Sequence, residues 1–556
     1  MFLASPDPEA CRAALERLRG ALEPFAPGPV VLVQAGPLAL GWFRVRQSDN
    51  LHAYSDGYLI GKVSPGEPAS QTAIRHAEPL PREVHPLART IAVEAGGGVA
   101  RIRPHGSAAV YFDSGAASDM QLLLADLHGR SPAPESVALL ASVGYFPGDL
   151  TLFREIRRVP LLHSLSAAGE LRRETRVPDS RWNDVEMTER LIGILPRTAP
   201  ATLAISGGCD SRFILGLLLG ARIPTELIRL SDPEDAVAER LASEVGLPLR
   251  ILKDERRSVA LPLYTLMTDG QIYSGGGHYS RLQGEVPAGS VCYLGLFADS
   301  ILKNAFRAAW KNPFAPGDFD DRLILEALLS RMRPREAGLL RGGSREELLR
   351  LLRAELAPTW EHARLTGRKQ RANWFYYVHR GLRWTTAHTA DLDFYTEVVL
   401  PLSDLTATVL GIQSSAWSNF DNARVRALSG RLLPSVRTPY ANGQTARVPG
   451  GLLGAARKIY YDFGARGLAH LRQKTRLGRP AGRPVAEKVA AERREQAPGF
   501  DEYFDRSLDA ILADPDCSRN VRRGASTVNE VLRYLSASRA QTRELRSASA
   551  PGAQRT

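Results

Sequence analysis

A short polar stretch, residues 206–211 (SGGCDS), separates two apolar runs of the chain. Its adjacent glycines allow a tight turn and a close backbone approach to a ligand. The run before it predicts a buried strand, and the run after it predicts a helix that ends at Gly220. The N-terminus of a helix favours a bound anion such as phosphate. A carboxylate beside phosphate needs a cation between them, so Asp210 predicts Mg²⁺ that bridges the carboxylate and phosphate oxygens.

A simpler interpretation of the same stretch is an ordinary turn in which Asp210 only caps the helix. The combination of two glycines, two serines and an aspartate between a buried strand and a helix favours phosphate binding instead. The two common phosphate motifs, G-x-x-x-x-G-K-[ST] and G-x-G-x-x-G, do not occur in the sequence. The stretch therefore predicts a phosphate loop of another type.

Strands and helices alternate after residue 201. Apolar runs predict strands near residues 225–230, 248–253 and 290–295, and the segment 232–246 has the cap, the apolar stripe and the final glycine of a helix. Such alternation predicts an α/β fold with a doubly wound parallel sheet and helices on both faces. Ligands of these sheets lie outside the carboxyl ends of the strands, where residues 206–211 are expected.

Different patterns flank this region. Up to about residue 181, short β-like runs are interrupted by glycine and proline, which predicts a strand-rich domain. The pattern becomes helical near residue 182, and beyond about residue 320 it is mostly helical. We therefore expect a strand-rich domain at 1–182, a sheet domain at 183–450 and a basic, mostly helical segment at 451–556.

The segment LAISGGCDSRFIL resembles the pyrophosphate-binding loop of the ATP-pyrophosphatase superfamily and, more narrowly, the SGGxDS motif of the asparagine synthetase family. Four further segments resemble that family in the same order. GDLTLFREIRRVPLLHSL resembles the end of its N-terminal domain, and DPEDAVAERLASEVGLPL resembles its second βα unit. LGLFADSILKN is similar to its G-E-G-x-D-E loop, and VVLPLSDLTATVLGI to its PFLD segment. The resemblance covers about residues 90–445.

The resemblance implies a sheet domain of the adenine nucleotide α-hydrolase type (PP-loop) after an α+β, Ntn-like glutaminase domain. It also implies ATP and Mg²⁺ as cofactors. A substrate carboxylate would be adenylated, pyrophosphate would leave on the loop, and an amine would attack to form an amide and AMP. The residues that it assigns to nucleotide, pyrophosphate and metal are Ser206, Gly207, Gly208, Asp210, Ser211, Leu230 and Ser231. Asp299 would share the metal with Asp210, the alternative for Asp299 being a helix cap.

Several residues depart from the family pattern. Full asparagine synthetases begin, after removal of methionine, with a cysteine that attacks glutamine, whereas this sequence begins Met1-Phe2. Cys11 lies in a predicted helix, so we expect a degenerate domain that does not hydrolyse glutamine and an amine donor other than glutamine. Leu296 replaces a glutamate or tyrosine of the family, and Ser300 replaces the final glutamate. An apolar Leu296 offers no partner for the ammonium of aspartate, so we do not expect aspartate as the substrate.

The lysine with which the family stabilises the adenylate has no clear counterpart. The corresponding segment carries only arginines, at positions 424, 426, 431 and 437. Arginine supplies the positive charge but neither the same geometry nor a deprotonated form. Lys303, one helical turn after Asp299, is the alternative catalytic cation, and an ordinary surface lysine is the simpler interpretation of it.

Composition limits the remaining choices. The chain has 556 residues, a formal net charge of +12 and four cysteines far apart in sequence, which indicates neither a disulfide framework nor a zinc site. Much of the positive charge lies at 457–483, where a solvated basic face is favoured over a nucleic-acid surface. No apolar run is long enough for a membrane span and no leader pattern precedes the first strand, so we expect a cytoplasmic protein.

The sequence leaves the substrates and the oligomeric state open. The carboxylate could belong to a metabolite, a peptide or a sugar acid. Two other functions also remain: a tRNA-modifying enzyme of the same superfamily, and a non-catalytic relative that only binds a nucleotide.

Overall fold

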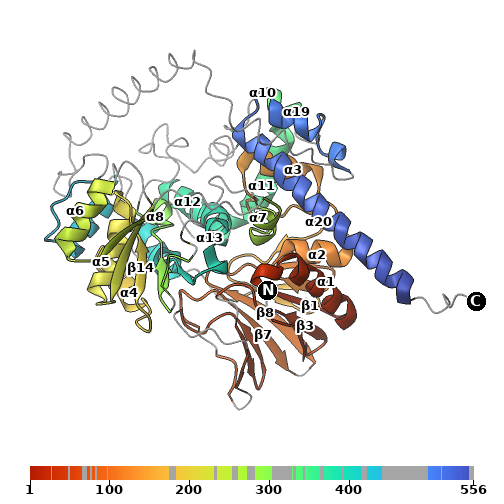
Figure 1. Cartoon of the computed structure of the whole chain (residues 1–556), viewed down its shortest axis with the longest axis horizontal. Coiled ribbons are helices and arrows are strands. Elements are labelled where there is room, and N and C mark those ends of the chain that lie inside the picture. The colour runs from red at the N-terminus through yellow and green to blue at the C-terminus, as the bar shows by residue number, and fades with distance from the viewer. Residues whose placement is uncertain are drawn as a thin grey trace, which may run out of the picture.

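The computed structural model contains a strand-rich N-terminal part, a parallel sheet with its helices, and a helical C-terminal part (Figure 1). It describes residues 1–26, 28–47, 50–65, 72–75, 78–81, 84–96, 98–174, 183–230, 235–252, 261–271, 282, 284–287, 289–302, 329, 334–341, 345–362, 368–390, 392–414, 422–440, 499–514 and 516–549. The predicted mixture of α and β structure with one parallel sheet is therefore confirmed. The basic stretch 457–483 lies outside the described residues.

The N-terminal part consists of two mainly antiparallel sheets. The first has the strand order β11-β9-β10-β1-β3-β2, and the second has the order β13-β12-β8-β7-β5-β4-β6, in which only β4 and β6 pair in parallel among the described strands. The strands of the first sheet are β1 (Phe2–Ser5), β2 (Val31–Ala35), β3 (Leu38–Trp42), β9 (Tyr111–Asp113), β10 (Ala116–Ser118) and β11 (Arg157–Arg158). Those of the second are β4 (Leu51–Tyr54), β5 (Gly57–Ile60), β6 (Thr72–Arg75), β7 (Thr90–Gly96), β8 (Val99–His105), β12 (His163–Ser166) and β13 (Leu171–Arg173).

The two sheets share one apolar core. Buried side chains from the first sheet, such as Phe2 and Trp42, pack in one cluster with Val93 and Ile102 from the second. The alternation of apolar and polar residues in these strands places the apolar side chains on the shared face. The strand-rich character predicted for this part is confirmed.

Helices α1 (Pro8–Ala21) and α2 (Gln121–His128) cover the other face of the first sheet, and α3 (Pro134–Val143) belongs to the same buried cluster. Asp7 caps α1 through its carboxylate, which accepts from two backbone amides of the first turn, and Pro8 fills the first helical position. Cys11 lies on the buried side of α1, and its thiol donates to the carbonyl of Leu3 (3.3 Å). Burial raises the pKa of this thiol to about 11, so Cys11 is not an activated nucleophile.

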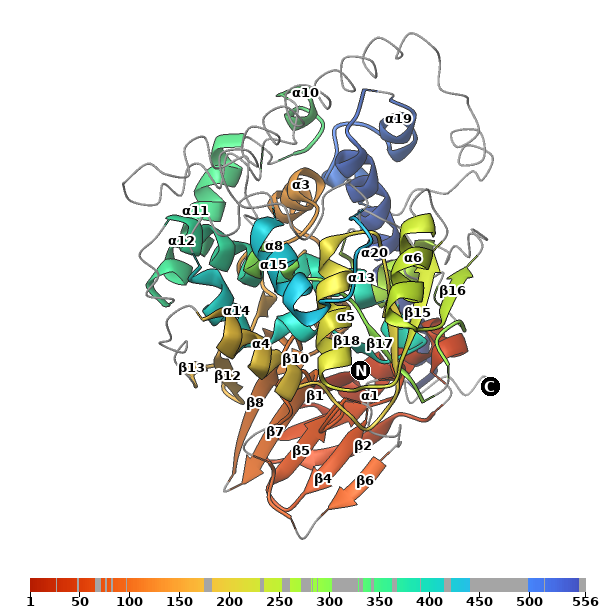
Figure 2. The same ribbon diagram turned by 90° about the vertical axis from the view of Figure 1, so that its left-hand side faces the viewer.

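The parallel sheet has the strand order β16-β15-β14-β17-β18 (Figure 2). Its strands are β14 (Ala201–Ala204), β15 (Thr225–Leu230), β16 (Leu249–Leu252), β17 (Val291–Tyr293) and β18 (Val398–Val399), and each neighbouring pair is parallel. The helices next to them in sequence are α4 (Asp184–Gly193), α5 (Cys209–Gly220), α6 (Asp235–Val245) and α8 (Ala298–Ile301). The predicted strands and the helices after them are confirmed, while β18 was not predicted.

Helix α5 is enclosed by other elements of the sheet domain, and its side chains are apolar on nearly all sides. Phe213 and Leu217 pack in one cluster with Leu203 of β14, and α4 and α15 (Ala423–Leu432) lie against the helix. Gly216 permits the contact with α15, since a Cβ at this position would lie 2.6 Å from Cβ of Leu432. The position of α5 is therefore fixed from several directions, which holds its N-terminus at the end of β14.

The remaining described elements are mostly helical. They are α7 (Leu261–Met267), α10 (Pro334–Ala337), α11 (Arg345–His362), α12 (Arg368–Phe375), the π-helix η4 (Tyr376–Thr385), α13 (Thr386–Ala390), α14 (Leu405–Ile412), α19 (Leu508–Ala513) and α20 (Arg519–Ser549), with short 3₁₀ turns η1 (Glu23–Phe25), η5 (Leu392–Phe394), η6 (Pro401–Ser403) and η9 (Phe500–Glu502). Figure 1 shows α12 and α13 between the parallel sheet and the N-terminal part. The helical character predicted for the C-terminal part is confirmed.

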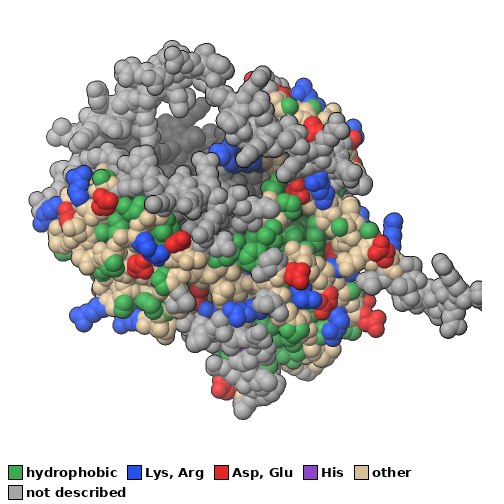
Figure 3. Space-filling model, in the orientation of Figure 1, with side chains coloured by type: hydrophobic (Ala, Val, Ile, Leu, Met, Phe, Trp, Pro, Cys, Tyr) green, Lys and Arg blue, Asp and Glu red, His purple; other side chains and the backbone are tan. Residues whose placement is uncertain are grey.

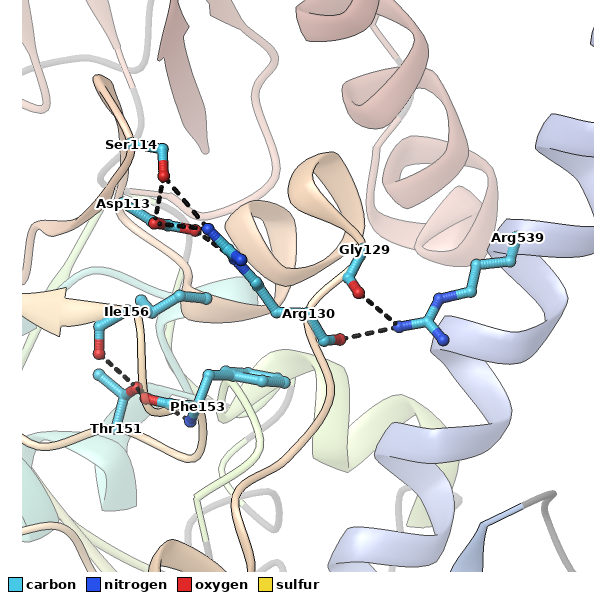
Figure 4. Close-up of polar contacts among 8 residues, drawn as sticks. All are labelled: Asp113, Ser114, Gly129, Arg130, Thr151, Phe153, Ile156 and Arg539. Atoms are coloured by element: carbon cyan, nitrogen blue, oxygen red, sulfur yellow. Dashed lines mark hydrogen bonds and ion pairs between the residues drawn. The ribbon is translucent and has the colours of Figure 1, made fainter.

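The C-terminal helix α20 returns to the N-terminal part. Its buried valines, Val521, Val528 and Val531, belong to the same core cluster as α1, α2 and α3. Figure 4 shows the polar end of this contact, where Arg539 donates to the carbonyl oxygens of Gly129 (3.1 Å) and Arg130 (2.9 Å). The last described helix is thus packed against α2 and α3 of the N-terminal part.

Charges are mixed on the surface. On the face drawn in Figure 3, lysine and arginine side chains of the described residues alternate with aspartate and glutamate. Within the described part of the chain, none of the helices combines the length and the hydropathy needed to cross a membrane.

A buried polar junction joins the N-terminal part to η4. The backbone N–H of Gly148 donates to Nδ1 of His379 (2.8 Å), and Arg383 donates to the carbonyl oxygen of Gly148 and to Asp149 (3.2 Å). Arg158 donates to the carbonyl oxygen of Leu382 (3.1 Å). Burial lowers the pKa of His379 to about 3, so that its imidazole is neutral in the folded protein.

Because His379 is buried and neutral, we expect acid to destabilise the folded protein. An unfolded histidine titrates near pH 6.5, so its contribution is fully present above that pH and is lost as the pH falls from 6.5 toward 3. His379→Asn keeps an acceptor for Gly148 but does not titrate. Between pH 7 and pH 4 we expect the parent to lose about 3 kcal/mol more unfolding free energy than the variant. Thermal unfolding across this range measures the difference, and parallel pH profiles would contradict the assignment.

Candidate functional site

The SGGCDS stretch lies where it was predicted, between the end of β14 and the start of α5. Helix α5 begins at Cys209, and its N-cap residue Gly208 has extended dihedral angles (φ −78°, ψ 167°) and provides no side-chain cap in the described structure. Strand β14 is the central strand, with β15 on one side and β17 on the other. The stretch therefore lies at the carboxyl end of β14. After β14, the chain adds strands first on one side of it and then on the other.

Hydrogen bonds between the two serines close the loop. The N–H of Ser206 donates to Oγ of Ser211 (3.0 Å), and the hydroxyl of Ser211 donates back to the carbonyl oxygen of Ser206 (3.2 Å). The two hydroxyl oxygens lie 3.1 Å apart, and the N–H of Gly208 donates to Oγ of Ser206 (3.2 Å). In this structure the serine hydroxyls hold the loop in shape, and Ser206 remains partly exposed.

Asp210 and Cys209 lie in the first turn of α5 and are both partly exposed. The thiol of Cys209 donates to Oδ1 of Asp210, at a distance of 3.5 Å. The acidic side chain is at the positive end of the helix dipole, where a negative charge is stabilised. The partly exposed side chain of Asp210 is therefore accessible from solvent, and its role in binding stays a prediction.

The loop between β17 and α8 packs directly on the first loop. A Cβ built on Gly295 would lie 3.0 Å from the carbonyl carbon of Asp210 and 3.1 Å from the backbone nitrogen of Ser211. These neighbours are backbone atoms, so only glycine fits without moving α5. Residues 85 positions apart in sequence are thereby brought into contact at neighbouring strand ends.

Phe297 in the same loop has a backbone conformation that non-glycine residues seldom adopt. It is the N-cap residue of α8, with φ 72° and ψ −8°, and its side chain is buried against the core. Its ring lies 5.6 Å from that of Tyr377 in η4. Strained residues of this kind collect at functional loops, and this one was not predicted.

Four predicted residues are only partly placed. Asp299 is within α8, whose N-cap is Phe297, so the interpretation of Asp299 as the helix cap is wrong. Leu230 is the last residue of β15, next to the end of β14. The structure describes the backbone but not the side chain of Asp299 and of Leu230. It does not describe Ser231 or Lys303.

Two buried arginines beside the loop were missed. Arg212 in α5 donates to the carbonyl oxygens of Thr438 (2.6 Å) and Pro439 (2.5 Å), and its guanidinium carbon lies 4.2 Å from the ring centroid of Tyr440. Arg229 in β15 donates to the carbonyl oxygen of Ile205, directly before the loop (3.3 Å). Burial lowers the pKa of Arg212. An arginine directly after the motif and another in an otherwise apolar strand were the available sequence signals.

The four arginines considered as replacements for the family lysine lie in different surroundings. Arg424 is bound to Asp184 (2.6 Å) and to the carbonyl oxygens of Ile301 and Gly411, so it joins helices instead of facing a ligand. Arg431 and Arg437 are exposed. Arg426 is buried within electrostatic reach of Tyr440, the residue on whose ring the guanidinium of Arg212 lies.

No protein-family model matches the chain, and no curated protein matches it. What the site can do is therefore inferred from its residues and its geometry.

Proposed function

We propose that the chain is an ATP-dependent, AMP-forming amide synthetase related to the asparagine synthetases. It would adenylate a substrate carboxylate and transfer the acyl group to an amine without hydrolysing glutamine. The observation that carries this proposal is the contact between the two motif loops, in which the backbone at Gly295 lies against Asp210 and Ser211. Two loops in contact at neighbouring strand ends are close enough to share one pyrophosphate and one metal.

The strand order supports the finer fold assignment. In the order β16-β15-β14-β17-β18 the chain runs outward in one direction from β14 and then in the other. This is the pattern of a doubly wound sheet, whose ligands lie at the point where the direction changes. We accordingly propose an adenine nucleotide α-hydrolase-like fold of the PP-loop type, preceded by a degenerate glutaminase-like domain.

The donor groups fit magnesium pyrophosphate. Asp210 offers carboxylate oxygen, which Mg²⁺ prefers, and the N-terminus of α5 offers amides and the helix dipole to an anion. Asp299 would be the second carboxylate, on the neighbouring strand end. When bound, Mg²⁺ would neutralise the charge of the leaving pyrophosphate. The buried arginines Arg212, Arg229 and Arg426 add positive potential around the same loop.

The conformation of Phe297 is a second support. The G-E-G-x-D-E loop of the family has glycine at the third position, which corresponds to Phe297 here. Its positive φ of 72° is the conformation that glycine adopts most readily. A left-handed residue at this position is what the glycine of the motif would provide, and this supports the resemblance of the loop to the motif.

The substrate remains a carboxylate of a metabolite, a peptide or a sugar acid. Leu296 is partly buried in the core cluster of the sheet and has no charge to offer an α-ammonium group. We therefore propose a substrate other than aspartate.

Exchange of labelled pyrophosphate into ATP tests the proposal. The panel should contain amino acids, sugar acids and peptides with free carboxylates, each with and without added tRNA. Exchange with an acid or peptide alone supports the amide synthetase. Exchange only with tRNA would indicate the tRNA-modifying alternative, and binding of ATP without exchange under any condition would indicate the non-catalytic one.

Cys209 offers a test that needs no carboxylate or amine substrate. It is partly exposed, whereas Cys11 and Cys292 are buried and burial raises their thiol pKa values to about 11 and about 12. We expect iodoacetamide at pH 8 to modify Cys209 before these two. We further expect ATP with Mg²⁺ to slow its modification by about tenfold, because the ligand would cover the first turn of α5. Peptide mass spectrometry measures both rates, and an unchanged rate at Cys209 with saturating nucleotide would count against binding there.

A further inference from the structure

A cavity of about 340 Å³ lies at the junction between the N-terminal part and the helices α11 to η4. Figure 2 shows β12 and β13 on the same side of the molecule as α11 and α12. One wall is apolar and includes Leu161, Leu162, Trp374 and Val378. This volume is in the range of small-molecule sites, so the cavity can enclose a compact organic ligand.

The polar lining has more positive than negative charge. Its described lining residues include four arginines and two carboxylates: Arg157, Arg158, Arg173, Arg383, Asp149 and Glu355. Both carboxylates are already paired, Glu355 with Arg157 (2.7 Å) and Asp149 with Arg383 (3.2 Å). Among the described residues, no carboxylate lies within ion-pair distance of Arg158 or Arg173.

Arg158 is a buried cation of this lining, with 7% of its surface exposed. Its guanidinium donates to the carbonyl oxygen of Leu382, which satisfies one of its five N–H groups. The neighbouring Arg383 is equally buried; desolvation and, second, the charge of Arg158 lower the pKa of Arg383 to about 9. Two adjacent buried cations are costly, and an anion in the cavity would offset this cost.

The carboxylates whose charges act on Arg158 are Asp149 and Asp269. Asp149 is paired with Arg383, and Asp269 accepts from the backbone amides of Gln121 and Leu122 and does not line the cavity. His379 is neutral and uses its Nδ1 to accept from Gly148. Burial and the charge of Asp269 raise the pKa of Tyr111 well above its usual range, so its phenol stays protonated. Desolvation raises the pKa of Asp149 as well, despite its pairing with Arg383. The excess positive charge is therefore a property of the cavity itself.

We propose that this cavity is a second ligand site, which binds a small amphipathic carboxylate. The carboxylate lies on the side lined by Arg158 and Arg173, and the hydrocarbon body lies against Leu161, Trp374 and Val378. Leu162 lines the same cavity with a positive φ of 65°, a strained conformation of the kind that persists at ligand sites. This site is separate from the SGGCDS loop and does not depend on the proposed synthetase activity.

Calorimetric titration of the full chain with 3-phenylpropionate tests the site. The matched neutral compound is 3-phenylpropanamide, which has the same body and no charge. We expect the acid to bind at least about tenfold more tightly than the amide, because hydrogen bonds to a charged acceptor are the stronger ones. Equal affinities, or heat from neither compound, would overturn the proposal.

Two variants locate the binding. Arg173→Gln removes an exposed charge at the cavity and should weaken binding of the acid about threefold, whereas Arg172→Gln, its exposed neighbour in β13, should not. Val378→Trp should abolish binding by filling the apolar side, with thermal unfolding as the check on its fold. If Arg173→Gln and Val378→Trp both bind 3-phenylpropionate like the parent, the cavity is not the binding site. Asp210→Ala should bind 3-phenylpropionate normally, so a failure of the synthetase proposal would leave this result unchanged.

Discussion

We expect Asp210→Ala to lower the rate of ATP–pyrophosphate exchange by about 100-fold or more with any carboxylate that supports exchange in the parent. The physical reason is electrostatic: removing one preorganised group that stabilises the charge of a transition state costs on the order of 3 kcal/mol. Asp210 is partly exposed in the first turn of α5, and Gly295 holds the second motif loop against its backbone. Under the proposed function, this carboxylate binds the metal that both loops share.

The control for this variant is Asp509→Ala. Asp509 is an exposed aspartate in the first turn of another helix, α19, so the substitution removes a similar interaction with a helix dipole. Both variants should lose less than about 1 kcal/mol of unfolding free energy. Asp509→Ala should exchange pyrophosphate like the parent. Full exchange by Asp210→Ala would show that the SGGCDS loop does not carry the chemistry.

The local elements of the sheet could be predicted because their information is local. Apolar runs of four to six residues bounded by glycine and proline predicted β14, β15, β16 and β17. The helix cap, the apolar stripe and the final glycine at 232–246 predicted α6. β18 could not be found in this way, because two residues are too few to show a period. Its place in the sheet depends on pairing with β17, about a hundred residues earlier in the chain.

The contacts that shape the candidate site also join residues that are far apart in the sequence. The motif predicted the loop and its serines, but it could not predict that Gly295 lies against Asp210 or that Arg212 lies on Tyr440. Arginine is usually an exposed residue, so the sequence favours the surface for Arg212. Its burial is possible because two backbone carbonyl groups from residues 438 and 439 accept its N–H groups.

Phe297 shows a further limit of sequence patterns. A bulky aromatic residue is a poor choice for a left-handed conformation, so the residue type conceals the turn that the backbone makes. The turn is retained because the Phe297 ring packs on Tyr377 and against Gly381, where an added Cβ would lie 2.6 Å from that ring. The apolar contacts of the ring thus offset the strain of the backbone.

The contact between the two motif loops gives the other large prediction, for Gly295→Ala. The added Cβ would lie 3.0–3.2 Å from three backbone atoms of Asp210 and Ser211, and none of these can move without shifting the start of α5. We expect a loss of about 1–3 kcal/mol in unfolding free energy, as for other overpacked positions. We also expect pyrophosphate exchange to fall at least tenfold in the folded variant, since a displacement of about 1 Å at a reacting site can cost a factor on the order of 100.

Gly193→Ala is the matched control, because a Cβ at this last residue of α4 meets nothing within 4 Å. Gly193→Ala should leave the unfolding free energy within about 1 kcal/mol of that of the parent. Its rate of pyrophosphate exchange should be close to that of the parent. Nucleotide binding separates the two effects of Gly295→Ala. If the loops share one ligand, the variant should lose affinity for ATP with Mg²⁺ even at temperatures where it is fully folded. A variant that is less stable but binds ATP with Mg²⁺ and exchanges pyrophosphate like the parent would show that the contact is structural only.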